Sequence, residues 1–285
     1  MTDRIEPVVG RYIHMEIEGR PHRLYWEEAG EGIPLLCLHT AGSDGRQFRG
    51  LLNDPDVTRH FRVVVYDMPW HGKSSPPAGW RDADGYKLTT EGYQCQILAV
   101  AEALKMDRPV CMGCSIGGRI VLHLGLDHPE KFRALVGLQT AAHTAPYYDT
   151  AWLDRPDIGS EVNAAYISGL FDPDAPEDER WETLWHYMQG GPGVFRGDLF
   201  FYTIDGDIRA RLSGIDTAAC PLYLLTGEYD YSGSPADTAV VADNVPGAQF
   251  EIMPGLGHFP MSENYEKFRT HLLPVLEKIR MTETA

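Results

Sequence analysis

From residue 33 onward, the sequence is divided by short runs in which nearly every residue is apolar. Strands with one exposed face alternate apolar and polar residues, so these runs predict strands buried on both faces. Helical patterns separate several of the runs, which is typical of a parallel sheet covered by helices on both sides. The runs are Pro34–Leu38, Val63–Tyr66, Val110–Met112, Ala134–Leu138, Leu222–Leu225 and Phe250–Met253, and the clearest helical patterns are Thr90–Leu104, Ile116–His128, Pro235–Asn244 and Asn264–Ile279.

Two regions depart from this alternation. Near the N-terminus, the β-rich stretches Tyr12–Ile17 and Leu24–Trp26 flank the turn signal Gly19-Arg20-Pro21 and predict a hairpin. Between about Thr140 and Leu212, proline, aspartate and aromatic residues crowd together and no buried strand is evident. We therefore expect one core, formed by residues 1–140 and 213–285, with a helical cap of residues 141–212 inserted into it.

The predicted cap is rich in aromatic residues. Residues 147–202 contain twelve of them in 56 positions, about twice the chain-wide 11%. This enrichment favours a lid over an apolar or aromatic ligand, although the same residues could form a small helical core of their own. The candidates for contact with a substrate are Tyr147, Tyr148, Trp152, Trp181 and Trp185.

Charge narrows the classes of function. The 285 residues include 25 Lys and Arg against 41 Asp and Glu, a formal net charge of −16. Such a chain repels phosphate backbones and anionic lipid, so we expect no nucleic-acid partner and no role at a membrane surface. The first residues lack the apolar stretch of a signal peptide, and no run of about 18 apolar residues occurs. We expect a soluble, cytoplasmic protein, and its composition leaves a homodimer open.

The five cysteines are an odd number, and most stand in apolar segments, which indicates reduced thiols. Cys111 and Cys114 have the C-x-x-C spacing of redox and zinc sites. No second pair or nearby histidine completes a set of four ligands, so we interpret both as small buried apolar residues. We expect no metal and no cofactor.

The segment Val110-Cys-Met-Gly-Cys-Ser-Ile-Gly-Gly118 carries the strongest chemical signal. An apolar strand runs into G-x-S-x-G and then into a predicted helix, which is the context that this motif requires. A serine in so tight a turn needs neighbours without side chains two positions away, hence Gly113 and Gly117. The turn presents Ser115 at a helix N-terminus, where the dipole favours a developing negative charge. We predict that Ser115 is a nucleophile rather than part of a chance match in a glycine-rich chain.

A serine hydroxyl needs a base, and the base needs an orienting acid. His258 stands in a glycine-flanked loop immediately after the last predicted strand, and Asp230 follows the preceding strand. Loops at the carboxyl ends of parallel strands meet at one edge of a sheet. We therefore predict His258 as the base and Asp230 as the acid. Glu228 stands two positions from Asp230 and could compete for the same role.

An oxyanion hole needs two backbone donors. One candidate is the N–H of Ile116, directly after the nucleophile. The other is the N–H of Thr40, in the His39-Thr40-Ala41-Gly42 loop that leaves a buried strand. In this interpretation His39 is structural.

With these motifs in place, the chain resembles the α/β-hydrolase superfamily over nearly its whole length. The resemblance is carried by the His39 loop, the turn Asp67–Ser74, the G-x-S-x-G turn at Ser115, Asp230 and His258. The resemblance implies an eight-stranded, mostly parallel sheet with a helical cap inserted after strand six. Within the superfamily, the chain is most similar to the capped esterases, lactonases and carbon–carbon bond hydrolases, which use this triad without a metal or organic cofactor. Epoxide hydrolases and haloalkane dehalogenases resemble the pattern too, but they require a carboxylate where Ser115 stands.

Two positions depart from the superfamily pattern. Thr40 replaces a common glycine, so that its hydroxyl either reaches the pocket as a third donor or packs behind it. Trp70 and His71 place bulk beneath the cap, and we interpret His71 as structural. The sequence thus predicts hydrolysis of a small to medium ester or lactone with apolar bulk. The alternatives are cleavage of a carbon–carbon bond next to a ketone and a ligand-binding protein that has lost catalysis.

Overall fold

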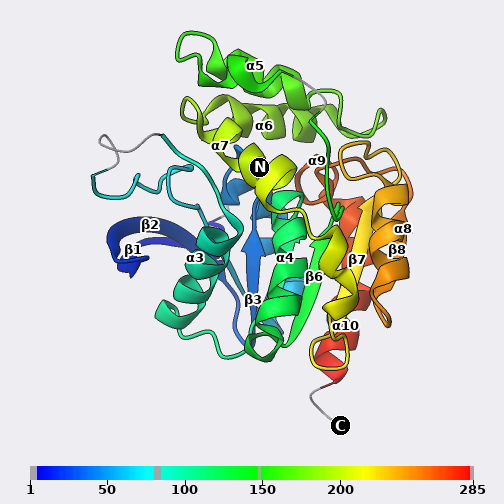
Figure 1. The fold of residues 1–285 in the computed structure, drawn as a ribbon. Helices are drawn as coiled ribbons and strands as arrows, with labels where there is room; N and C mark the ends of the chain where they lie inside the picture. Colours follow the sequence, from blue (N-terminus) through cyan, green and yellow to red (C-terminus); the bar gives the residue numbers. More distant parts are fainter. Residues whose placement is uncertain (1–4, 80–84, 147–148, 283–285) are drawn as a thin grey trace.

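A single mixed sheet organises the computed structural model, which describes residues 5–79, 85–146 and 149–282. The described residues form eight strands in the order β1-β2-β4-β3-β5-β6-β7-β8 (Figure 1). The pairs β1–β2 and β2–β4 are antiparallel and all other neighbours are parallel, which confirms the predicted fold class. The strands are β1 (Val9–Ile17), β2 (Arg20–Ala29), β3 (Ile33–Leu38), β4 (Phe61–Tyr66), β5 (Val110–Cys114), β6 (Ala134–Leu138), β7 (Leu222–Gly227) and β8 (Gln249–Met253).

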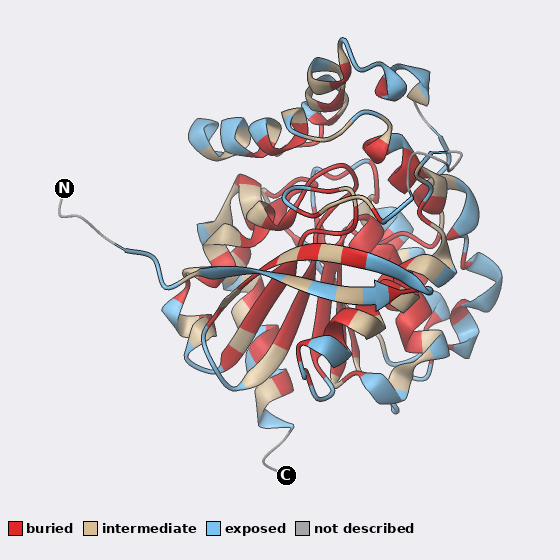
Figure 2. Ribbon diagram, turned by 90° about the vertical axis from the view of Figure 1, so that its left-hand side faces the viewer, coloured by how far each residue is buried: buried red, intermediate tan, exposed pale blue. Residues whose placement is uncertain are grey.

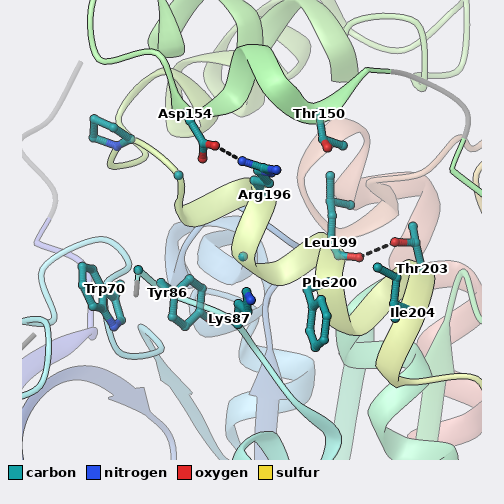
Figure 3. A pocket seen from close by; sticks show the side chains of 14 residues that line it. Trp70, Tyr86, Lys87, Thr150, Asp154, Arg196, Leu199, Phe200, Thr203 and Ile204 are labelled. Carbon is teal, nitrogen blue, oxygen red and sulfur yellow. Dashed lines mark hydrogen bonds and ion pairs between the residues drawn. The ribbon is translucent and has the colours of Figure 1, made fainter. Parts of the chain in front are cut away.

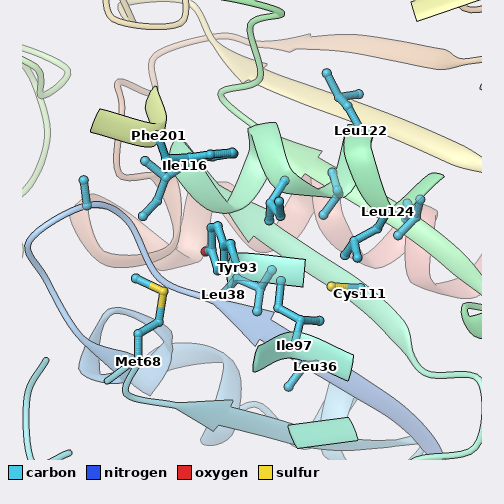
Figure 4. Close-up of a cluster of buried hydrophobic side chains, with 14 of the residues drawn as sticks. Leu36, Leu38, Met68, Tyr93, Ile97, Cys111, Ile116, Leu122, Leu124 and Phe201 are labelled. Atoms are coloured by element: carbon cyan, nitrogen blue, oxygen red, sulfur yellow. The ribbon is translucent and has the colours of Figure 1, made fainter. Parts of the chain in front are cut away.

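The central strands are buried on both faces because successive side chains enter opposite cores. In β3, Leu36 and Leu38 pack with α3 (Thr90–Ala103) and α4 (Ile116–Asp127), in the cluster shown in Figure 4. The alternate residues of the same strand pack on the other face with α10 (Tyr265–Met281). Figure 2 shows the resulting block of buried strands beneath the more exposed first hairpin.

Two details of the strand predictions are wrong. β8 is mostly exposed rather than buried on both faces, because it is the last strand in the order and only β7 pairs with it. The predicted N-terminal hairpin is present, but its turn is Glu18-Gly19, and Arg20 already belongs to β2. Glu18 and Gly19 have φ values of 50° and 72°, a pair of left-handed residues that suits a two-residue hairpin turn.

Residues 141–212, which we call the cap segment, lie between β6 and β7 above the carboxyl ends of the parallel strands (Figure 1). Its described residues form helices and turns and no strand. These are the 3₁₀ helix η4 (Thr150–Asp154), α5 (Gly159–Ile167), α6 (Glu177–Met188), α7 (Val194–Phe200), the π-helical turn η5 (Phe201–Asp205) and the 3₁₀ helix η6 (Arg209–Gly214).

In the described part of the chain, no helix combines the length and apolar character needed to cross a membrane.

Shorter elements complete the connections between the strands. The remaining helices are η1 (Gly45–Phe48), α1 (Arg49–Leu52), α2 (Pro55–Thr58), η3 (Pro129–Lys131), α8 (Pro235–Asn244) and α9 (Pro260–Glu263).

The cap segment is attached to the core through a buried arginine of α4. Arg119 has no exposed surface, and its guanidinium donates to the carbonyl oxygens of Ala141, Tyr202 and Gly206 and to the Thr144 hydroxyl. The last three of these contacts measure 3.2, 3.3 and 3.0 Å. All four acceptors belong to the cap segment. Burial of an arginine is costly unless its donors are satisfied, so these bonds make the cap segment part of the core's own packing.

Candidate active site

Ser115 occupies a sharp turn between β5 and α4. Its φ of 60° and ψ of −110° are unusual for a residue with a side chain, and its N–H donates to the Leu138 carbonyl at 3.0 Å. A Cβ at Gly113 would lie 2.4 Å from the Gly117 carbonyl oxygen, and one at Gly118 would lie 2.4 Å from that of Leu138. The glycines of the motif therefore permit the close packing of strand, turn and helix, and the strained serine is a feature found at functional sites.

The loops after β7 and β8 bring Asp230 and His258 into contact. Asp230 Oδ2 lies 2.8 Å from His258 Nδ1, and both side chains are buried. The other carboxylate oxygen of Asp230 accepts the N–H groups of Ser232 at 2.8 Å and Gly233 at 3.2 Å. These bonds fix the carboxylate so that it orients the imidazole. A carboxylate at Nδ1 places the proton there and leaves Nε2 as the basic nitrogen.

Glu228, the competing carboxylate, contacts a different group. It is exposed, and its Oε2 accepts the N–H of Gly255 at 3.0 Å. It thus supports the loop that leads to His258, whereas Asp230 contacts the imidazole itself.

Gln139 ties the acid and base loops together. Its side-chain oxygen accepts the N–H of Gly227 at 2.8 Å, and its amide nitrogen donates to the Gly257 carbonyl. Gln139 is fully buried and has a φ of 55°, the left-handed region that costs a residue with a Cβ. No motif marked this residue in the sequence, because its role depends on two loops that are distant along the chain.

Glu263 holds the His258 loop from below. Its carboxylate accepts the N–H groups of Gly257 and of Phe259, the latter at 3.3 Å. Burial raises the pKa of Glu263 to about 8, since the desolvation of the charge outweighs these two bonds. On the cap side, the backbone N–H of His258 donates to the Leu170 carbonyl at 2.9 Å. The backbone of the base is therefore held by both the core and the cap segment.

Ser115 and His258 line the same small cavity of about 20 Å³. They do not hydrogen-bond to each other among the contacts of the described residues. The rest of the wall is mostly apolar and comes from the His39 loop, the cap segment, the loop after β7 and the residue after His258. These residues are Ala41, Ile167, Leu170, Tyr187, Phe195, Leu199, Tyr202, Ser232 and Phe259.

The Thr40 N–H is not available as an oxyanion donor, which corrects the prediction for this residue. It donates to the side-chain oxygen of Gln47 at 3.0 Å, and the Thr40 hydroxyl donates to the same oxygen at 3.0 Å. The hydroxyl also lies 2.5 Å from that of Tyr187. Thr40 thus packs behind the pocket, while the next residue, Ala41, lines the cavity with Ser115. The loop turns one residue later than the sequence suggested.

The cap tryptophans also lie elsewhere than predicted. Trp152, Trp181 and Trp185 are 47%, 62% and 65% exposed, and none of them lines the cavity at Ser115. In α6, the face that carries Tyr187 turns toward the core, and Trp181 and Trp185 stand on the outer face. Tyr147 and Tyr148 lie outside the described residues.

A second buried aspartate–histidine pair lies beneath the cap segment. Asp198 of α7 has one oxygen 2.8 Å from His71 Nε2, and the same oxygen accepts the Gly42 N–H at 2.7 Å. Its other oxygen accepts the Tyr86 hydroxyl at 2.7 Å. His71 Nδ1 lies 2.9 Å from the Pro69 carbonyl oxygen, so both ring nitrogens face acceptors and both must carry protons. The Asp198 carboxylate and these bonds raise the pKa of His71 despite the opposing effect of burial.

His39 lies beside His71, with ring centroids 4.9 Å apart, and has the opposite protonation. Its Nδ1 donates to the Thr40 carbonyl at 2.9 Å, and its Nε2 accepts the Met68 N–H at 3.2 Å. This is a neutral imidazole. Burial and the neighbouring His71 charge lower its pKa to about 4. Both nitrogens of His39 and of His71 are engaged in holding loops.

The cysteines contribute no reactive thiol to this site. All five are free, and all but Cys95 are buried. Burial raises the pKa of Cys111 and of Cys114, so both thiols stay protonated. Among the residues that the structure describes, no group of three or more His, Cys, Asp or Glu side chains is arranged to hold a metal ion.

Comparison with known proteins agrees with the fold. A family model for the alpha/beta hydrolase fold matches residues 33–163. A proline iminopeptidase of Neisseria gonorrhoeae is 34% identical over 138 residues, which are 47% of this chain and only 41% of that protein. A 2-hydroxymuconate semialdehyde hydrolase of Pseudomonas sp. (strain CF600) is 25% identical over 92% of both chains.

Among solved structures, Est816, titled as an N-acyl homoserine lactone degrading enzyme, has a TM-score of 0.72 and 28% identity, covering 91% of this chain and 98% of its own. Together with the strand order and the turn at Ser115, these matches define the class: the chain has the alpha/beta hydrolase fold and is similar to hydrolases of that fold. The chain is also similar to a pimeloyl-[acyl-carrier protein] methyl ester esterase of Nitrosospira multiformis, at 23% identity over 88% of this chain and 97% of that protein.

Proposed function

We propose that the protein is a serine hydrolase in which Ser115, His258 and Asp230 form a catalytic triad. The single observation that carries this proposal is the buried Asp230–His258 pair, which opens onto the same cavity as the strained Ser115. Both ring nitrogens of His71 are bonded, but His258 keeps Nε2 free of protein partners among the described residues. A histidine with one oriented and one open nitrogen suits a general base.

The proposed reaction is acyl transfer to water. Ser115 Oγ attacks the substrate carbonyl while His258 takes the hydroxyl proton, and the carbonyl oxygen becomes an oxyanion. His258 then returns the proton to the leaving group, and the acyl-enzyme forms. A water molecule attacks the acyl-enzyme with the same base, which releases the acid and restores Ser115. Asp230 fixes the His258 tautomer and stabilises its imidazolium form.

The oxyanion is proposed to bind the N–H groups of Ile116 and Ala41. Ile116 is the first residue of α4, where N–H groups have no acceptor within the helix. Ala41 lines the cavity, and its N–H has no acceptor among the described residues. Two such donors beside the nucleophile meet the geometric need of a tetrahedral intermediate.

The proposed substrate is a small to medium ester or lactone with apolar bulk. The cavity wall supports this class, since eight of its side chains are aliphatic or aromatic, among them Ile167, Leu170, Phe195 and Phe259. The similarity to the lactone-degrading Est816 across most of both chains also favours it. In this proposal the cap segment covers the site as a separate cap and supplies its apolar wall.

The test is a serine replacement with a matched control. Ser115→Ala should lower kcat/KM for a short p-nitrophenyl ester by about 10³-fold or more and abolish labelling by a fluorophosphonate probe. Ser232→Ala, which removes another hydroxyl of the same cavity, should keep labelling and most of the activity. Circular dichroism spectra of both variants should match that of the parent. Retention of a tenth of the activity by Ser115→Ala would refute the nucleophile assignment.

A second candidate is cleavage of a carbon–carbon bond next to a ketone. The similarity to the semialdehyde hydrolase over 92% of both chains favours it, and the same three residues support it. Turnover of a β-diketone together with poor ester hydrolysis would select this reaction. The absence of both activities and of probe labelling would indicate a ligand-binding protein.

We propose further that the enzyme acts on a small molecule in the cytoplasm without a metal or organic cofactor. The net charge of −16 disfavours anionic polymers and lipid surfaces as partners. Dialysis against EDTA should leave ester hydrolysis unchanged, and a loss of activity that zinc restores would overturn this part of the proposal.

A further inference from the structure

The cavity at Ser115 is too small for the substrate class proposed above. Its volume of about 20 Å³ is close to the minimum that one water molecule needs, whereas pockets for drug-sized ligands measure about 300–1,000 Å³. Most of an ester of medium size must therefore occupy other space. A larger cavity of about 630 Å³ lies between the cap segment and the core (Figure 3).

Leu199 of α7 is the wall between these two spaces. It is 6% exposed, and it lines both the Ser115 cavity and the larger one. The backbone around it is fixed, because the Gly197 carbonyl accepts the Leu88 N–H at 3.0 Å and the Leu199 carbonyl accepts the Thr203 hydroxyl at 2.7 Å. The leucine side chain makes no hydrogen bond, so only its packing with apolar neighbours holds it between the two cavities.

The larger cavity offers aromatic surfaces. Trp70 and Tyr86 have ring centroids 5.7 Å apart on one side, and Phe200 lies on α7 beside Leu199 (Figure 3). Trp70 has a φ of 77°, a strained conformation that is costly for a bulky residue. The ammonium group of Lys87 lies 5.6 Å from the Phe200 ring centroid. Aromatic side chains bind flat apolar groups by stacking and edge contacts, so this lining suits a substrate ring.

We propose that the cavity lined by Trp70, Tyr86 and Phe200 binds an aromatic ring of the substrate, and that Leu199 controls its access to Ser115. This inference rests on the proposed function, since it names the substrate class of the same site. In the bound state the ring lies on the far side of Leu199 and the carbonyl lies at Ser115. Leu199 then determines which substrates reach both spaces at once.

A second neighbouring space provides the competing route. Ser232 lines the Ser115 cavity and also a cavity of about 500 Å³ on the opposite side, with Tyr231, His143 and Asp237. That lining has one aromatic side chain, Tyr231, which is 60% exposed, so it lacks the neighbouring rings of the first cavity. An experiment can distinguish the two cavities, because each is lined by a different aromatic side chain that can be replaced by alanine.

The experiment compares kcat/KM for ethyl acetate with that for two phenyl esters, ethyl 4-phenylbutanoate and 2-phenylethyl acetate. These place the ring on the acyl side and on the alcohol side. We expect at least one phenyl ester to exceed ethyl acetate by about tenfold or more. Phe200→Ala should remove most of this preference and change ethyl acetate hydrolysis less than about threefold. Leu199→Trp, at a residue that also lines the Ser115 cavity, should remove the preference whatever its effect on ethyl acetate. Tyr231→Ala and Leu153→Ala, a buried cap-segment leucine that lines neither cavity, should retain the preference.

Equal losses for all three esters, no phenyl preference in the parent protein, or loss of preference only in Tyr231→Ala would each overturn the inference. Binding of 4-phenylbutanoate to Ser115→Ala, measured by calorimetry, separates it from the proposed function. Binding that Phe200→Ala weakens supports the ring site even where no ester is hydrolysed. A preference for ethyl 4-phenylbutanoate without such binding refutes the ring site and leaves the serine hydrolase proposal intact.

Discussion

The described residues include two buried aspartate–histidine pairs whose closest atoms are equally far apart, and we propose a catalytic role for only one of them. Asp230 and His258 meet at 2.8 Å, as do Asp198 and His71. In the first pair the aspartate contacts Nδ1 and the ring borders a cavity. In the second, the aspartate contacts Nε2 and a carbonyl takes Nδ1. A short contact and deep burial thus do not distinguish the two pairs. They differ in whether the second ring nitrogen of the histidine is bonded to a protein acceptor.

The two pairs also differ in what they connect. Asp230 and His258 come from adjacent loops of the core, and their bond fixes a ring that lines the same cavity as Ser115. Asp198 comes from the cap segment, and it joins His71, Tyr86 and the Gly42 N–H beside the proposed oxyanion loop. We interpret the first pair as part of the reaction and the second as a buried ion pair that holds the cap segment against the core.

The largest expected effect comes from Asp230→Asn. Asparagine stabilises the wrong tautomer of His258 and has no negative charge to stabilise the imidazolium form. We therefore expect kcat to fall by about 10⁴-fold. Glu228→Gln, the matched change at an exposed carboxylate of the same loop, should cost less than about threefold. Steady-state hydrolysis of a p-nitrophenyl ester measures both. The reverse ranking would make Glu228 the acid.

Asp198→Asn should act on stability more than on chemistry. It leaves the charged His71 without its counterion, which for a buried pair costs on the order of 3 kcal/mol in the free energy of unfolding. Urea denaturation measures this loss, and kcat/KM per folded molecule should fall less than about tenfold. A loss of activity as large as that of Asp230→Asn, in a stably folded variant, would show that the second pair takes part in the reaction.

The second pair should also leave a signature in pH dependence. The pKa of His71 is raised in the folded protein, so its contribution to stability is complete below about pH 6.5 and is lost as pH rises through the folded pKa. The free energy of unfolding should therefore decline as the pH rises above about 6.5, and Asp198→Asn should flatten that decline.

Glu263 provides the control for this measurement. Its raised pKa of about 8 means that the folded state holds a proton which the unfolded state has lost, so stability falls between about pH 4.5 and 8. Glu263→Gln should remove this component and keep the part due to His71. An unchanged slope in Asp198→Asn would mean that His71 is not the titrating group.

The smallest effect is expected at Thr40. Thr40→Val removes the hydroxyl bonds to Gln47 and Tyr187 but keeps the backbone N–H, so stability should fall by about 1 kcal/mol and kcat by less than about fivefold. Thermal denaturation and ester hydrolysis measure the two. A loss of a hundredfold in kcat with normal stability would restore the hydroxyl as a donor to the substrate.

The sequence predicted those parts of the molecule that depend on local signals. The strands were evident because a strand buried on both faces must be apolar throughout, and β8 was misjudged because its apolar residues lie at an edge. The contact between Asp230 and His258 followed from loops at the same end of a parallel sheet. The neighbour of Thr40 was missed because a one-residue offset in a loop depends on the Gln47 side chain, seven positions away.

The cap segment was the least predictable region. Aromatic enrichment indicated a lid, but which aromatic residues face the core depends on how each short helix is rotated. Tyr187 and Trp185 stand two positions apart in α6 and have opposite surroundings. Asp198 and Gln139 carried no signal at all, since their partners lie 127 and 88 positions away.

The attachment of Arg119 limits how this scaffold can be re-engineered. An exchange of lids between related hydrolases assumes that the inserted segment contacts the core only at its two junctions. Here a graft at residues 141–212 would strip a fully buried guanidinium of four acceptors and His71 of its carboxylate. A transplanted lid must therefore bring its own acceptors for both cations, or the recipient must lose Arg119 and His71 in the same step. Successful chimeras of this chain should be those whose junctions respect these two buried charges.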